Sequence, residues 1–425
     1  MDSIVMQGGK PIIGEIYISG SKNASLPLMT VSLLTDEDLI LTNVPKLSDI
    51  STMKQLLSNH GTEIGILDNQ DSFKLTLSSK NITNSIAPYD IVRKMRASIW
   101  VLGPLLARCG KAKVSLPGGC AIGARQVDLH LAAMEALGAT IAIENGYIIA
   151  ESNGRLKGCN FEFSKQSVGA TINAILASVL ADGESNFINC AMEPEISDLC
   201  HCLNSMGAEI YGVGTPNLKI VGKEKLSGCE YSVLPDRIEA GTYMIAAAAT
   251  RGNILLKGIK LSILENLVSC IRKSGVYVEE EEEGIRIKHT GEIKPVNIST
   301  EPYPGFSTDL QAQFMTLMIL ANGKSEVQEN IFENRFMHVP ELCRMGANIT
   351  IDGNKALVDG VSELKGAEVM ASDLRASVSL VIAGLVANGE TKIRRIYHLD
   401  RGYQSLEQKL ANCGANISRI TGDTV

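Results

Sequence analysis

A local pattern that recurs six times along the chain constrains the fold more than any other feature of the sequence. In each copy, an amphipathic stretch typical of a helix ends at a glycine and runs into a short stretch typical of a strand. The glycines are Gly61, Gly138, Gly207, Gly275, Gly346 and Gly414, separated by 77, 69, 68, 71 and 68 residues. Glycine is expected here because the residue after a helix end commonly takes a left-handed backbone conformation. The long period predicts six complex modules rather than a simple solenoid.

A second recurring pattern lies between these glycines. A strand-like stretch is followed by a polar or charged residue and then by a helical stretch rich in Ala, Leu, Ile and Met. The six copies begin at Lys22, Arg96, Ser167, Arg237, Asp309 and Arg375. Because these helices are apolar on nearly all sides, we expect them to be buried, with the amphipathic helices outside them. The expected fold class is α/β, with sheets wrapped around internal helices.

Six modules in 425 residues indicate two domains of three modules each, since one hydrophobic core rarely serves so long a chain. The opening stretch at Gly14 has the same pattern as the stretches that begin at Gly228 and Gly366, each of which runs into an apolar helix. Residues 1–21 are therefore assigned to the C-terminal half. This assignment predicts one domain of residues 22–233 and a second of residues 1–21 plus 234–425, with the chain crossing twice between them.

Composition excludes several function classes. A net charge of −7 argues against nucleic acid as the main partner. The ten cysteines are scattered, the first residues lack a leader pattern, and the apolar runs are shorter than the ~18 residues of a membrane span. We therefore expect free thiols, a cytoplasmic location and no membrane insertion. Cys200-His201-Cys202 lies in a helical pattern and is interpreted as structural, and no metal-ligand cluster is predicted among the six histidines.

Residues 114–125 predict a reactive loop. Pro117, Gly118 and Gly119 break regular structure, so Cys120 is expected near the tip of a turn, and Arg125 follows five residues later. A thiol beside a guanidinium is suited to act as nucleophile or proton donor toward an anionic substrate. The alternative interpretation is a small residue in a glycine-rich turn with a solvated Arg125, because cysteine is more often a small buried apolar residue.

Charged residues gather at the predicted starts of the buried helices. They are Lys22, Arg93, Arg96, Lys165, Arg237, Asp309 and Arg375. Helix amino ends carry free N–H groups and a partial positive charge, so they bind anions. A charge at the mouth of an apolar helix must face an opening or a partner, since burying it alone is costly. The pattern predicts a positively charged cleft for an anionic substrate; the alternative is a set of separate caps and salt bridges.

Five stretches spread over the whole chain are specific enough to indicate a family. They are Ser19-Gly-Ser-Lys-Asn-Ala-Ser-Leu-Pro, Leu116-Pro-Gly-Gly-Cys-Ala-Ile-Gly-Ala-Arg, Thr308-Asp-Leu-Gln-Ala-Gln-Phe, Glu333-Asn-Arg-Phe-Met-His and Asp400-Arg-Gly-Tyr. A chain with these motifs resembles the UDP-N-acetylglucosamine enolpyruvyl transferases of bacterial peptidoglycan synthesis. The resemblance implies two inside-out α/β barrels, each of three βαβαββ units, with the active site between them. It also implies enolpyruvyl transfer from phosphoenolpyruvate to the 3-hydroxyl of UDP-N-acetylglucosamine, with no metal or organic cofactor.

The resemblance implies roles for individual residues. Cys120 corresponds to the loop cysteine that acts as general acid, forms an adduct with phosphoenolpyruvate and is alkylated by fosfomycin. Lys22, Arg125 and Arg401 correspond to the cations that hold the phosphate and carboxylate, and Asp309 to the carboxylate beside the sugar hydroxyl. The UDP-sugar positions correspond to Asn23, Arg96, Arg125, Gln126, Val127, Asp128, Leu129, Lys165, Gln166, Ser167, Val168 and Ile331, and Arg375 to a basic residue that the second domain contributes.

Two other interpretations stay open. The related transferase that acts on shikimate 3-phosphate shares the implied fold, although its loop lacks this cysteine motif and its lysine motif differs. A non-catalytic paralogue that binds a UDP-sugar is the second, and the presence of Cys120, Lys22, Asp309 and Arg401 argues against it. Gln126 and Ser307 stand at positions where the family usually has proline. The replacement at Gln126 affects how the uracil ring of the substrate is expected to pack against this turn. The oligomeric state is left open.

Overall fold

The computed structural model describes residues 2–69, 71–117 and 127–422. Within these ranges the chain forms two units with separate hydrophobic cores. Of the described residues, 19–69, 71–117 and 127–234 form the N-terminal unit, and 2–18 with 235–422 form the C-terminal unit. The chain therefore passes from one unit to the other twice, after Ile18 and after Leu234.

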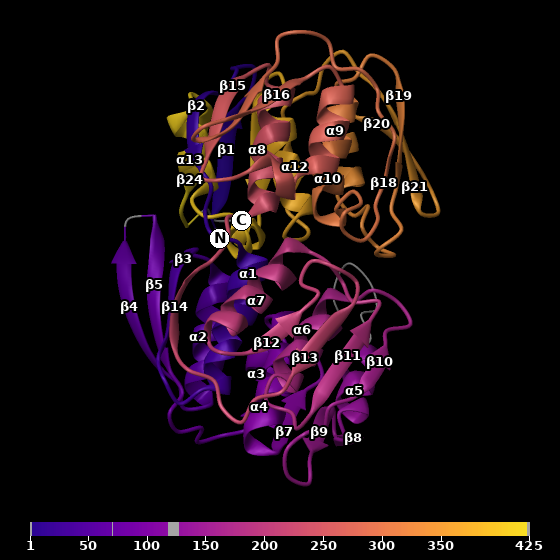
Figure 1. Ribbon diagram of the computed structural model, residues 1–425. Coiled ribbons are helices and arrows are strands. Elements are labelled where there is room, and N and C mark those ends of the chain that lie inside the picture. Colours follow the sequence, from indigo (N-terminus) through magenta and orange to yellow (C-terminus); the bar gives the residue numbers. More distant parts are fainter. Residues whose placement is uncertain (1, 70, 118–126, 423–425) are drawn as a thin grey trace. The chain divides into compact units, whose positions relative to one another are not determined.

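The N-terminal unit contains three sheets, three inner helices and three outer helices (Figure 1). The inner helices are α1 (Lys22–Val31), α4 (Leu102–Cys109) and α6 (Val168–Ser178); the 3-10 helix η1 (Ser32–Leu34) follows α1, and η2 (Arg96–Val101) leads into α4. The outer helices are α2 (Ser48–Asn59), α5 (Asp128–Ala136) and α7 (Pro194–Ser205), and α3 (Tyr89–Val92) is a single turn. The first sheet has the strand order β14 (Cys229–Ser232), β3 (Leu39–Val44), β5 (Ser72–Ser78), β4 (Glu63–Asn69). The second has the order β6 (Ile86–Ala87), β7 (Lys111–Ser115), β9 (Tyr147–Glu151), β8 (Thr140–Glu144). The third has the order β10 (Asn160–Glu162), β11 (Glu184–Ile188), β13 (Leu218–Val221), β12 (Glu209–Tyr211).

The C-terminal unit repeats this plan. Its inner helices are α8 (Arg237–Ala249), α10 (Gln311–Ile319) and α12 (Ala376–Val386), and its outer helices are α9 (Glu265–Lys273), α11 (Val339–Arg344) and α13 (Leu406–Asn412). Three 3-10 helices, η3 (Leu261–Ile263), η4 (Thr308–Leu310) and η5 (Ile396–Arg401), precede α9, α10 and α13. The first sheet has the strand order β2 (Ile13–Tyr17), β15 (Asn253–Lys257), β17 (Gly284–Lys288), β16 (Tyr277–Glu281). The second has the order β18 (Ile298–Ser299), β19 (Lys324–Gln328), β21 (Lys355–Asp359), β20 (Asn348–Asp352). The third has the order β22 (Glu368–Met370), β23 (Glu390–Arg394), β1 (Ser3–Gln7), β24 (Asn416–Ile420).

All six sheets share one pairing pattern, which explains the sixfold repeat in the sequence. The first two strands of each sheet are parallel, and the remaining pairs are antiparallel. An inner helix connects the parallel pair in the modules that the chain does not interrupt, as a crossover between parallel strands requires. The two crossings separate strands from their sheets in sequence, so β14 pairs with β3 and the amino-terminal β2 pairs with β15.

The repeated glycines end all six outer helices, as the sequence predicts. Gly61, Gly138, Gly207, Gly275, Gly346 and Gly414 have φ values between 91° and 100°. At each one, the next residue's N–H donates to the carbonyl five residues before it, for example Ala139 N to Met134 O at 3.1 Å and Ala208 N to Leu203 O at 3.0 Å. This bond is the Schellman closure of a helix, and it requires a left-handed residue that glycine adopts without steric cost.

The inner helices are buried, as their all-round apolar pattern predicts. All residues of α8 and the first ten of α12 are buried. The three inner helices of the C-terminal unit pack on one another, and each also packs on its own sheet. The charged residues at their starts are therefore the polar exceptions in otherwise apolar surroundings.

The barrels implied by the resemblance are not found as closed structures. Among the described strands, each unit has three separate four-stranded sheets whose edges are not joined by hydrogen bonds. The edge strands β6 and β18 have only two residues each, which is too short for a ladder that could close a barrel. The architecture is a mixed α/β fold of sheets around inner helices.

Two further features concern membranes and metals. Among the described residues, no helix combines the length with the apolar character that crossing a bilayer requires. In the same residues, no group of three or more His, Cys, Asp and Glu side chains could hold a metal ion. Cys200 and Cys202 are buried in α7, where the Cys202 thiol hydrogen-bonds with the Cys229 thiol, and His201 between them is exposed.

Candidate functional site

Charged and polar residues mark the amino ends of the inner helices in the N-terminal unit. Lys22 is the first residue of α1, Arg96 is the first residue of η2, and Ser167 caps α6. η2 contacts both α1 and α6, and Trp100 of η2 donates through Nε1 to Gly169 O at 3.2 Å, close to the start of α6. The Ser167 hydroxyl accepts a hydrogen bond from Ala170 N at 3.4 Å, which satisfies one of the free N–H groups of the helix.

Lys22 is held by an acidic partner rather than solvated. Its Nζ lies 3.4 Å from Asp49 Oδ2, and the two side chains are only 8% and 5% exposed. Asp49 is in the first turn of α2, where a negative charge also interacts favourably with the helix dipole. Asn23 follows Lys22 and is half-buried. This arrangement fixes a positive charge at the start of α1 with little side-chain freedom.

A buried polar cluster lies behind Arg96. His130 of α5 has its Nδ1 at 2.9 Å from Asn173 Nδ2, and Asn173 also donates to Ile99 O at 3.0 Å. Burial and, secondly, the charge of Arg96 lower the pKa of His130 to about 4, so the ring is neutral at pH 7. A neutral ring can accept the Asn173 hydrogen bond at Nδ1. Asn173 of α6 thereby links η2, through Ile99, with α5, through His130.

The other positions predicted for the UDP-sugar in this unit lie nearby in the chain but differ in exposure. Val127, Gln166, Ser167 and Val168 are half-buried, Asp128 and Lys165 are exposed, and Leu129 is buried. Gln166 donates through Nε2 to Cys190 O at 3.3 Å. The predicted residues Cys120, Arg125 and Gln126 lie outside the described residues.

In the C-terminal unit, Asp309 lies between two buried arginines. Arg335 Nη2 donates to Asp309 Oδ1 at 2.5 Å, and Arg375 Nε lies 3.4 Å from Asp309 Oδ2. The arginine side chains are 5% and 3% exposed, whereas that of Asp309 is 23% exposed. The backbone also fixes this carboxylate, because the Ser307 hydroxyl accepts from Asp309 N at 3.3 Å. Asp309 is therefore held on one side by two cations and keeps contact with solvent on the other.

Arg375 immediately precedes α12, and its position is set by a helix cap and by an aromatic ring. Asp373 Oδ1 accepts from Arg375 N at 2.8 Å and from Ala376 N at 3.0 Å. The guanidinium carbon lies 5.4 Å from the centre of the Tyr403 ring. Burial lowers the pKa of Arg375, but Tyr403, Asp309 and Asp236 together raise it above its ordinary value. Arg375 is therefore a permanent buried cation.

Glu329 joins the segments that carry Asp309 and Ile331. Its carboxylate accepts from Thr300 Oγ1 at 3.0 Å, Thr308 Oγ1 at 2.8 Å, Ile331 N at 2.9 Å and Phe332 N at 3.1 Å. Glu329 is 3% exposed, so these four donors compensate the desolvation of its charge. The sequence reasoning assigned no role to Glu329.

Arg401 is the last residue of η5 and is half-buried. Burial lowers the pKa of the neighbouring His398, and the charge of Arg401 lowers it further, while Asp373 opposes this shift. Burial also lowers the pKa of His338 to about 4, with Asp373 again opposing and Arg335 assisting. Both histidines are thereby kept neutral beside a group of arginines.

The structure brings two of the predicted residues, Asp309 and Arg375, into contact. It adds Arg335, Glu329 and Tyr403 around them, a contact set that the helix-start pattern did not specify. Arg335 lies in the motif that begins at Glu333, and Tyr403 lies in the motif that begins at Asp400. Membership of these motifs is the sequence signal that could have marked both residues as candidates. Ile331 lies on the segment that Glu329 fastens. Arg237, the first residue of α8, stacks 5.7 Å from the Tyr303 ring centre and lines a separate cavity of about 340 Å³ that Ser307 and Leu310 also line.

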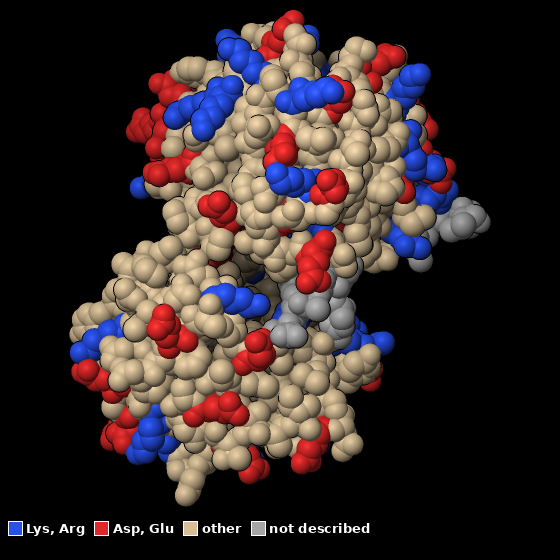
Figure 2. Space-filling model, turned by 90° about the vertical axis from the view of Figure 1, so that its right-hand side faces the viewer, with Lys and Arg blue, Asp and Glu red and all other residues tan. Residues whose placement is uncertain are grey.

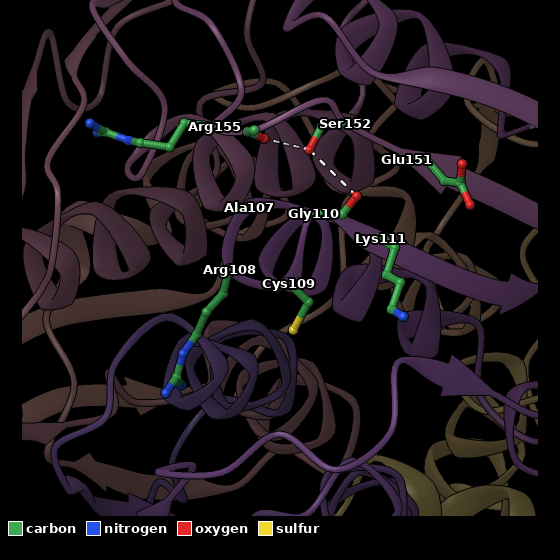
Figure 3. Close-up of a pocket in the computed structure, with 9 residues that line it drawn as sticks. Ala107, Arg108, Cys109, Gly110, Lys111, Glu151, Ser152 and Arg155 are labelled. Atoms are coloured by element: carbon green, nitrogen blue, oxygen red, sulfur yellow. Dashed lines mark hydrogen bonds between the residues drawn. The ribbon is translucent and has the colours of Figure 1, made fainter.

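A larger cavity of about 460 Å³ lies in the N-terminal unit at the carboxyl end of α4 (Figure 3). Arg108 and Arg155 line it, but their guanidinium groups point away from each other in the close-up. Arg108 donates to Leu33 O and Thr35 O, and Arg155 donates to Leu180 O and Ala181 O. Both arginines therefore satisfy carbonyls beyond the ends of α1 and α6. The cavity is at the opposite end of α4 from Arg96, and we assign it no chemistry.

The surface gives no sign of a broad basic area on the side shown in Figure 2. Among the described residues of that face, Lys and Arg side chains alternate with Asp and Glu. The positive charges relevant to an anionic ligand are instead the buried or half-buried ones at the helix starts. A local arrangement of this kind attracts a small anion without a positive net charge on the whole protein.

Comparison with known proteins defines the class of this fold. The enolpyruvyl transferase NikO from Streptomyces tendae superposes with a TM-score of 0.89 at 23% identity, covering 99% of each chain. EPSP synthase from Acinetobacter baumannii superposes with a TM-score of 0.76 at 17% identity, covering 99% of this chain and 100% of that one. At these identities the likeness concerns the fold alone, which is that of enolpyruvyl transferases.

Sequence comparison gives the family. The family model described as EPSP synthase (3-phosphoshikimate 1-carboxyvinyltransferase) matches residues 6–410. Two curated relatives are named UDP-N-acetylglucosamine 1-carboxyvinyltransferase: that of Rickettsia bellii (strain OSU 85-389) is 61% identical and that of Rickettsia canadensis (strain McKiel) 62%, each over 420 residues, or 99% of this chain and 100% of the relative. The chain belongs to the enolpyruvyl transferase family. The family inferred from the five motifs is confirmed.

Proposed function

We propose that this protein transfers the enolpyruvyl group of phosphoenolpyruvate to the 3-hydroxyl of UDP-N-acetylglucosamine and releases phosphate, a step of peptidoglycan synthesis. The observation that carries the proposal is identity above 60% over the whole chain with proteins named for this reaction. The setting of Asp309 supports it, because a partly exposed carboxylate flanked by buried arginines suits proton transfer next to an anionic substrate.

The reaction requires an acid, a base and several cations. The sugar hydroxyl adds to C2 of phosphoenolpyruvate while a proton is delivered to C3, which gives a tetrahedral ketal. Loss of the C3 proton then expels phosphate and forms the enol ether. Because phosphoenolpyruvate carries a phosphate and a carboxylate, it accepts an alcohol only when cations neutralise these groups.

Asp309 is proposed as the base that takes the proton of the sugar hydroxyl. Arg335 and Arg375 hold one side of its carboxylate, which restricts its rotation and orients the remaining lone pairs. Cys120 is proposed as the general acid for C3, since a thiol with an ordinary pKa of about 8.5 retains its proton near neutral pH. The family resemblance supports the further proposal that fosfomycin alkylates Cys120, through the thiolate form of the side chain.

Lys22, Arg125, Arg375 and Arg401 are proposed to neutralise the anionic groups of the substrates. The ion pair with Asp49 supports this role for Lys22, because it fixes the ammonium at the amino end of α1. The remaining predicted positions are proposed to bind the UDP-sugar: Asn23, Arg96, Gln126, Val127, Asp128, Leu129, Lys165, Gln166, Ser167, Val168 and Ile331. We further propose a domain of residues 22–233 and a domain of residues 1–21 plus 234–425, each of which contributes substrate-binding residues.

The proposal is tested by steady-state phosphate release from phosphoenolpyruvate with two acceptors in parallel, UDP-N-acetylglucosamine and shikimate 3-phosphate. We expect turnover with the sugar nucleotide and background release with the shikimate. Turnover with shikimate 3-phosphate alone would assign the protein to the related transferase. Tight binding of UDP-N-acetylglucosamine without phosphate release would make it a non-catalytic binding protein.

Asp309→Asn tests the base and preserves the shape of the side chain. We expect turnover to fall about 100-fold or more, which is a typical loss for a general base. Asp359→Asn is the matched control, because Asp359 is 43% exposed at the end of β21 and pairs there with Lys324. Equal turnover of the two variants would remove Asp309 from the mechanism.

A further inference from the structure

We propose that Tyr403 is a positioning residue that holds the Arg375 guanidinium in place beside Asp309. The inference rests on the proposed function, because that proposal assigns Asp309 and Arg375 to the substrates. Tyr403 is 3% exposed and follows η5. Its ring centre lies 5.4 Å from Arg375 Cζ, a distance at which a cation and an aromatic face attract each other. In a buried site this attraction is stronger than at the surface.

The restraint matters because Arg375 has few others. Among the described residues, the Tyr403 hydroxyl is the one side-chain hydrogen-bond partner of the Arg375 guanidinium, although the side chain is only 3% exposed. The contact with Asp309, 3.4 Å from Nε to Oδ2, is an ion pair without hydrogen-bond geometry. Among the described residues, the Tyr403 side chain and this ion pair therefore hold the guanidinium, and its remaining N–H donors can bind an anionic ligand.

Tyr403 is itself fixed by a directional hydrogen-bond chain. The Thr242 hydroxyl donates to Ile238 O at 2.8 Å, so its oxygen is free to accept from the Tyr403 hydroxyl at 3.0 Å. Gln313 Nε2 donates one hydrogen bond to Asp309 O at 2.9 Å and a second to the Tyr403 oxygen at 3.2 Å. The chain runs from α10 through Tyr403 to α8. Consequently the phenol is tied both to the backbone of Asp309 and to the helix beside it.

The backbone on either side of Tyr403 is constrained as well. A β-carbon at Gly402 would lie 2.4 Å from Leu374 Cδ1 and 3.4 Å from Arg375 Nη1. The segment of Arg401, Gly402 and Tyr403 therefore packs directly against the segment that carries Arg375. Burial raises the pKa of Tyr403 and the charge of Arg375 opposes this shift, so the phenol stays neutral at pH 7 and keeps its donor hydrogen.

Two substitutions separate the ring from the hydroxyl. Tyr403→Phe keeps the ring under Arg375 but removes the hydrogen-bond chain, and Tyr403→Leu removes both. We expect kcat/KM for phosphoenolpyruvate to fall about 10-fold in the first and about 100-fold in the second, with the KM for UDP-N-acetylglucosamine unchanged. Tyr243→Phe is the matched control, since Tyr243 is a fully buried tyrosine of α8 whose hydroxyl has no hydrogen-bond partner among the described residues. This control should keep wild-type kinetics.

A double-mutant cycle with Arg375→Lys decides whether Tyr403 acts through Arg375. A lysine lacks the planar group that stacks on the ring, so Tyr403→Leu should lower kcat/KM less than about threefold once Arg375 is lysine. If the fold-losses in kcat/KM of Tyr403→Leu and Arg375→Lys multiply in the double variant, the two residues act independently. That result would overturn the proposal and make Tyr403 a structural residue. Wild-type kinetics in both Tyr403 variants would overturn it as well.

A readout that does not need turnover separates this proposal from the proposed function. The Arg375 Nε–H signal, assigned by its loss in Arg375→Lys, should be slow to exchange with solvent in the wild-type protein and in Tyr403→Phe. It should exchange much faster in Tyr403→Leu. Unchanged exchange in Tyr403→Leu would refute the positioning role whether or not the protein turns over phosphoenolpyruvate. A wild-type protein that shows the exchange effect but no turnover would refute the proposed function alone.

Discussion

At the scale of single residues, burial separates the charged groups into two kinds. Lys22, Arg335 and Arg375 are nearly inaccessible and each contacts a carboxylate, so their charges are fixed in position. Asp309 is more exposed than the arginines that hold it. A fixed cation costs little reorganisation when an anion arrives, and a partly open carboxylate can exchange a proton. This division supports the proposed roles, in which the buried cations bind anions and Asp309 transfers a proton.

The buried histidine behind Arg96 predicts a pH dependence of stability. The folded pKa of His130 is about 4, below the value of about 6.5 expected in the unfolded chain. Between these values the unfolded chain binds a proton that the folded protein does not, so stability falls as the pH drops from 6.5 to 4. The loss is on the order of 3 kcal/mol. Urea unfolding across this range should show a shallower slope of free energy against pH for His130→Gln, and an identical slope would contradict the account.

Glu329→Gln should weaken both stability and the site. Oε1 of Glu329 accepts three of the four hydrogen bonds and Oε2 accepts the one from Thr308, whereas glutamine keeps the shape but has a single, uncharged accepting oxygen. We expect the free energy of unfolding to fall by about 1–3 kcal/mol and the KM for UDP-N-acetylglucosamine to rise, because a neutral amide holds Ile331 more weakly. Glu333→Gln, an exposed neighbour, is the control and should change neither quantity. Equal unfolding curves for the two variants would argue against the anchoring role.

At the scale of elements, the sequence was most informative where one residue meets a local backbone requirement. The six glycines predicted the ends of the outer helices because a left-handed residue is needed at each end. The apolar stretches predicted the inner helices because no polar side could face water. Both signals are local, and both patterns are confirmed by the structure.

Two of these glycines provide a test with an internal comparison. A β-carbon at Gly207 would meet no atom within 4 Å, so Gly207→Ala costs only backbone strain, about 1 kcal/mol. At Gly61 the same carbon would lie 2.6 Å from Asn81 O and 2.8 Å from Thr83 Oγ1. Gly61→Ala should therefore lower the melting temperature clearly more than Gly207→Ala. The reverse order would show that the helix closures do not govern these positions.

The rest of the candidate site could not be derived from sequence, because it depends on contacts between modules. Asp309 and Arg375 stood out since each begins an apolar helix, but nothing local indicates that they touch. Arg335 and Tyr403 come from segments outside those helices and reach Asp309 and Arg375 only through tertiary packing. The inside-out barrels implied by the resemblance are not confirmed for a similar reason: the repeat predicts each sheet but not whether neighbouring sheets join.

At the scale of the whole molecule, the chain crossings make the two units unequal in autonomy. All described strands of the N-terminal unit come from one part of the chain, between residues 39 and 232. The C-terminal unit depends on the amino-terminal residues, because β1 lies between β23 and β24 and β2 pairs with β15 (Figure 1). Without them, one of its sheets lacks a central strand and another lacks an edge strand.

This inequality predicts the behaviour of fragments. A fragment of residues 19–234 should fold alone, with a single cooperative unfolding transition by circular dichroism. A fragment of residues 235–425 should lack cooperative unfolding, and a peptide of residues 1–18 added in trans should restore it, because the peptide supplies β1 and β2. Cooperative unfolding of residues 235–425 without the peptide would contradict the strand exchange.

The central claim is that the protein moves an enolpyruvyl group onto UDP-N-acetylglucosamine. It is tested most directly by following [2-¹³C]phosphoenolpyruvate by ¹³C NMR in the presence of the sugar nucleotide and the wild-type protein, with phosphate measured in the same sample. The account predicts that the label moves into an enol ether attached to the sugar, with one phosphate released per enol ether formed, and that Asp309→Asn greatly slows this transfer. Label that stays in phosphoenolpyruvate, or that appears in pyruvate while the sugar nucleotide is unchanged, would contradict it.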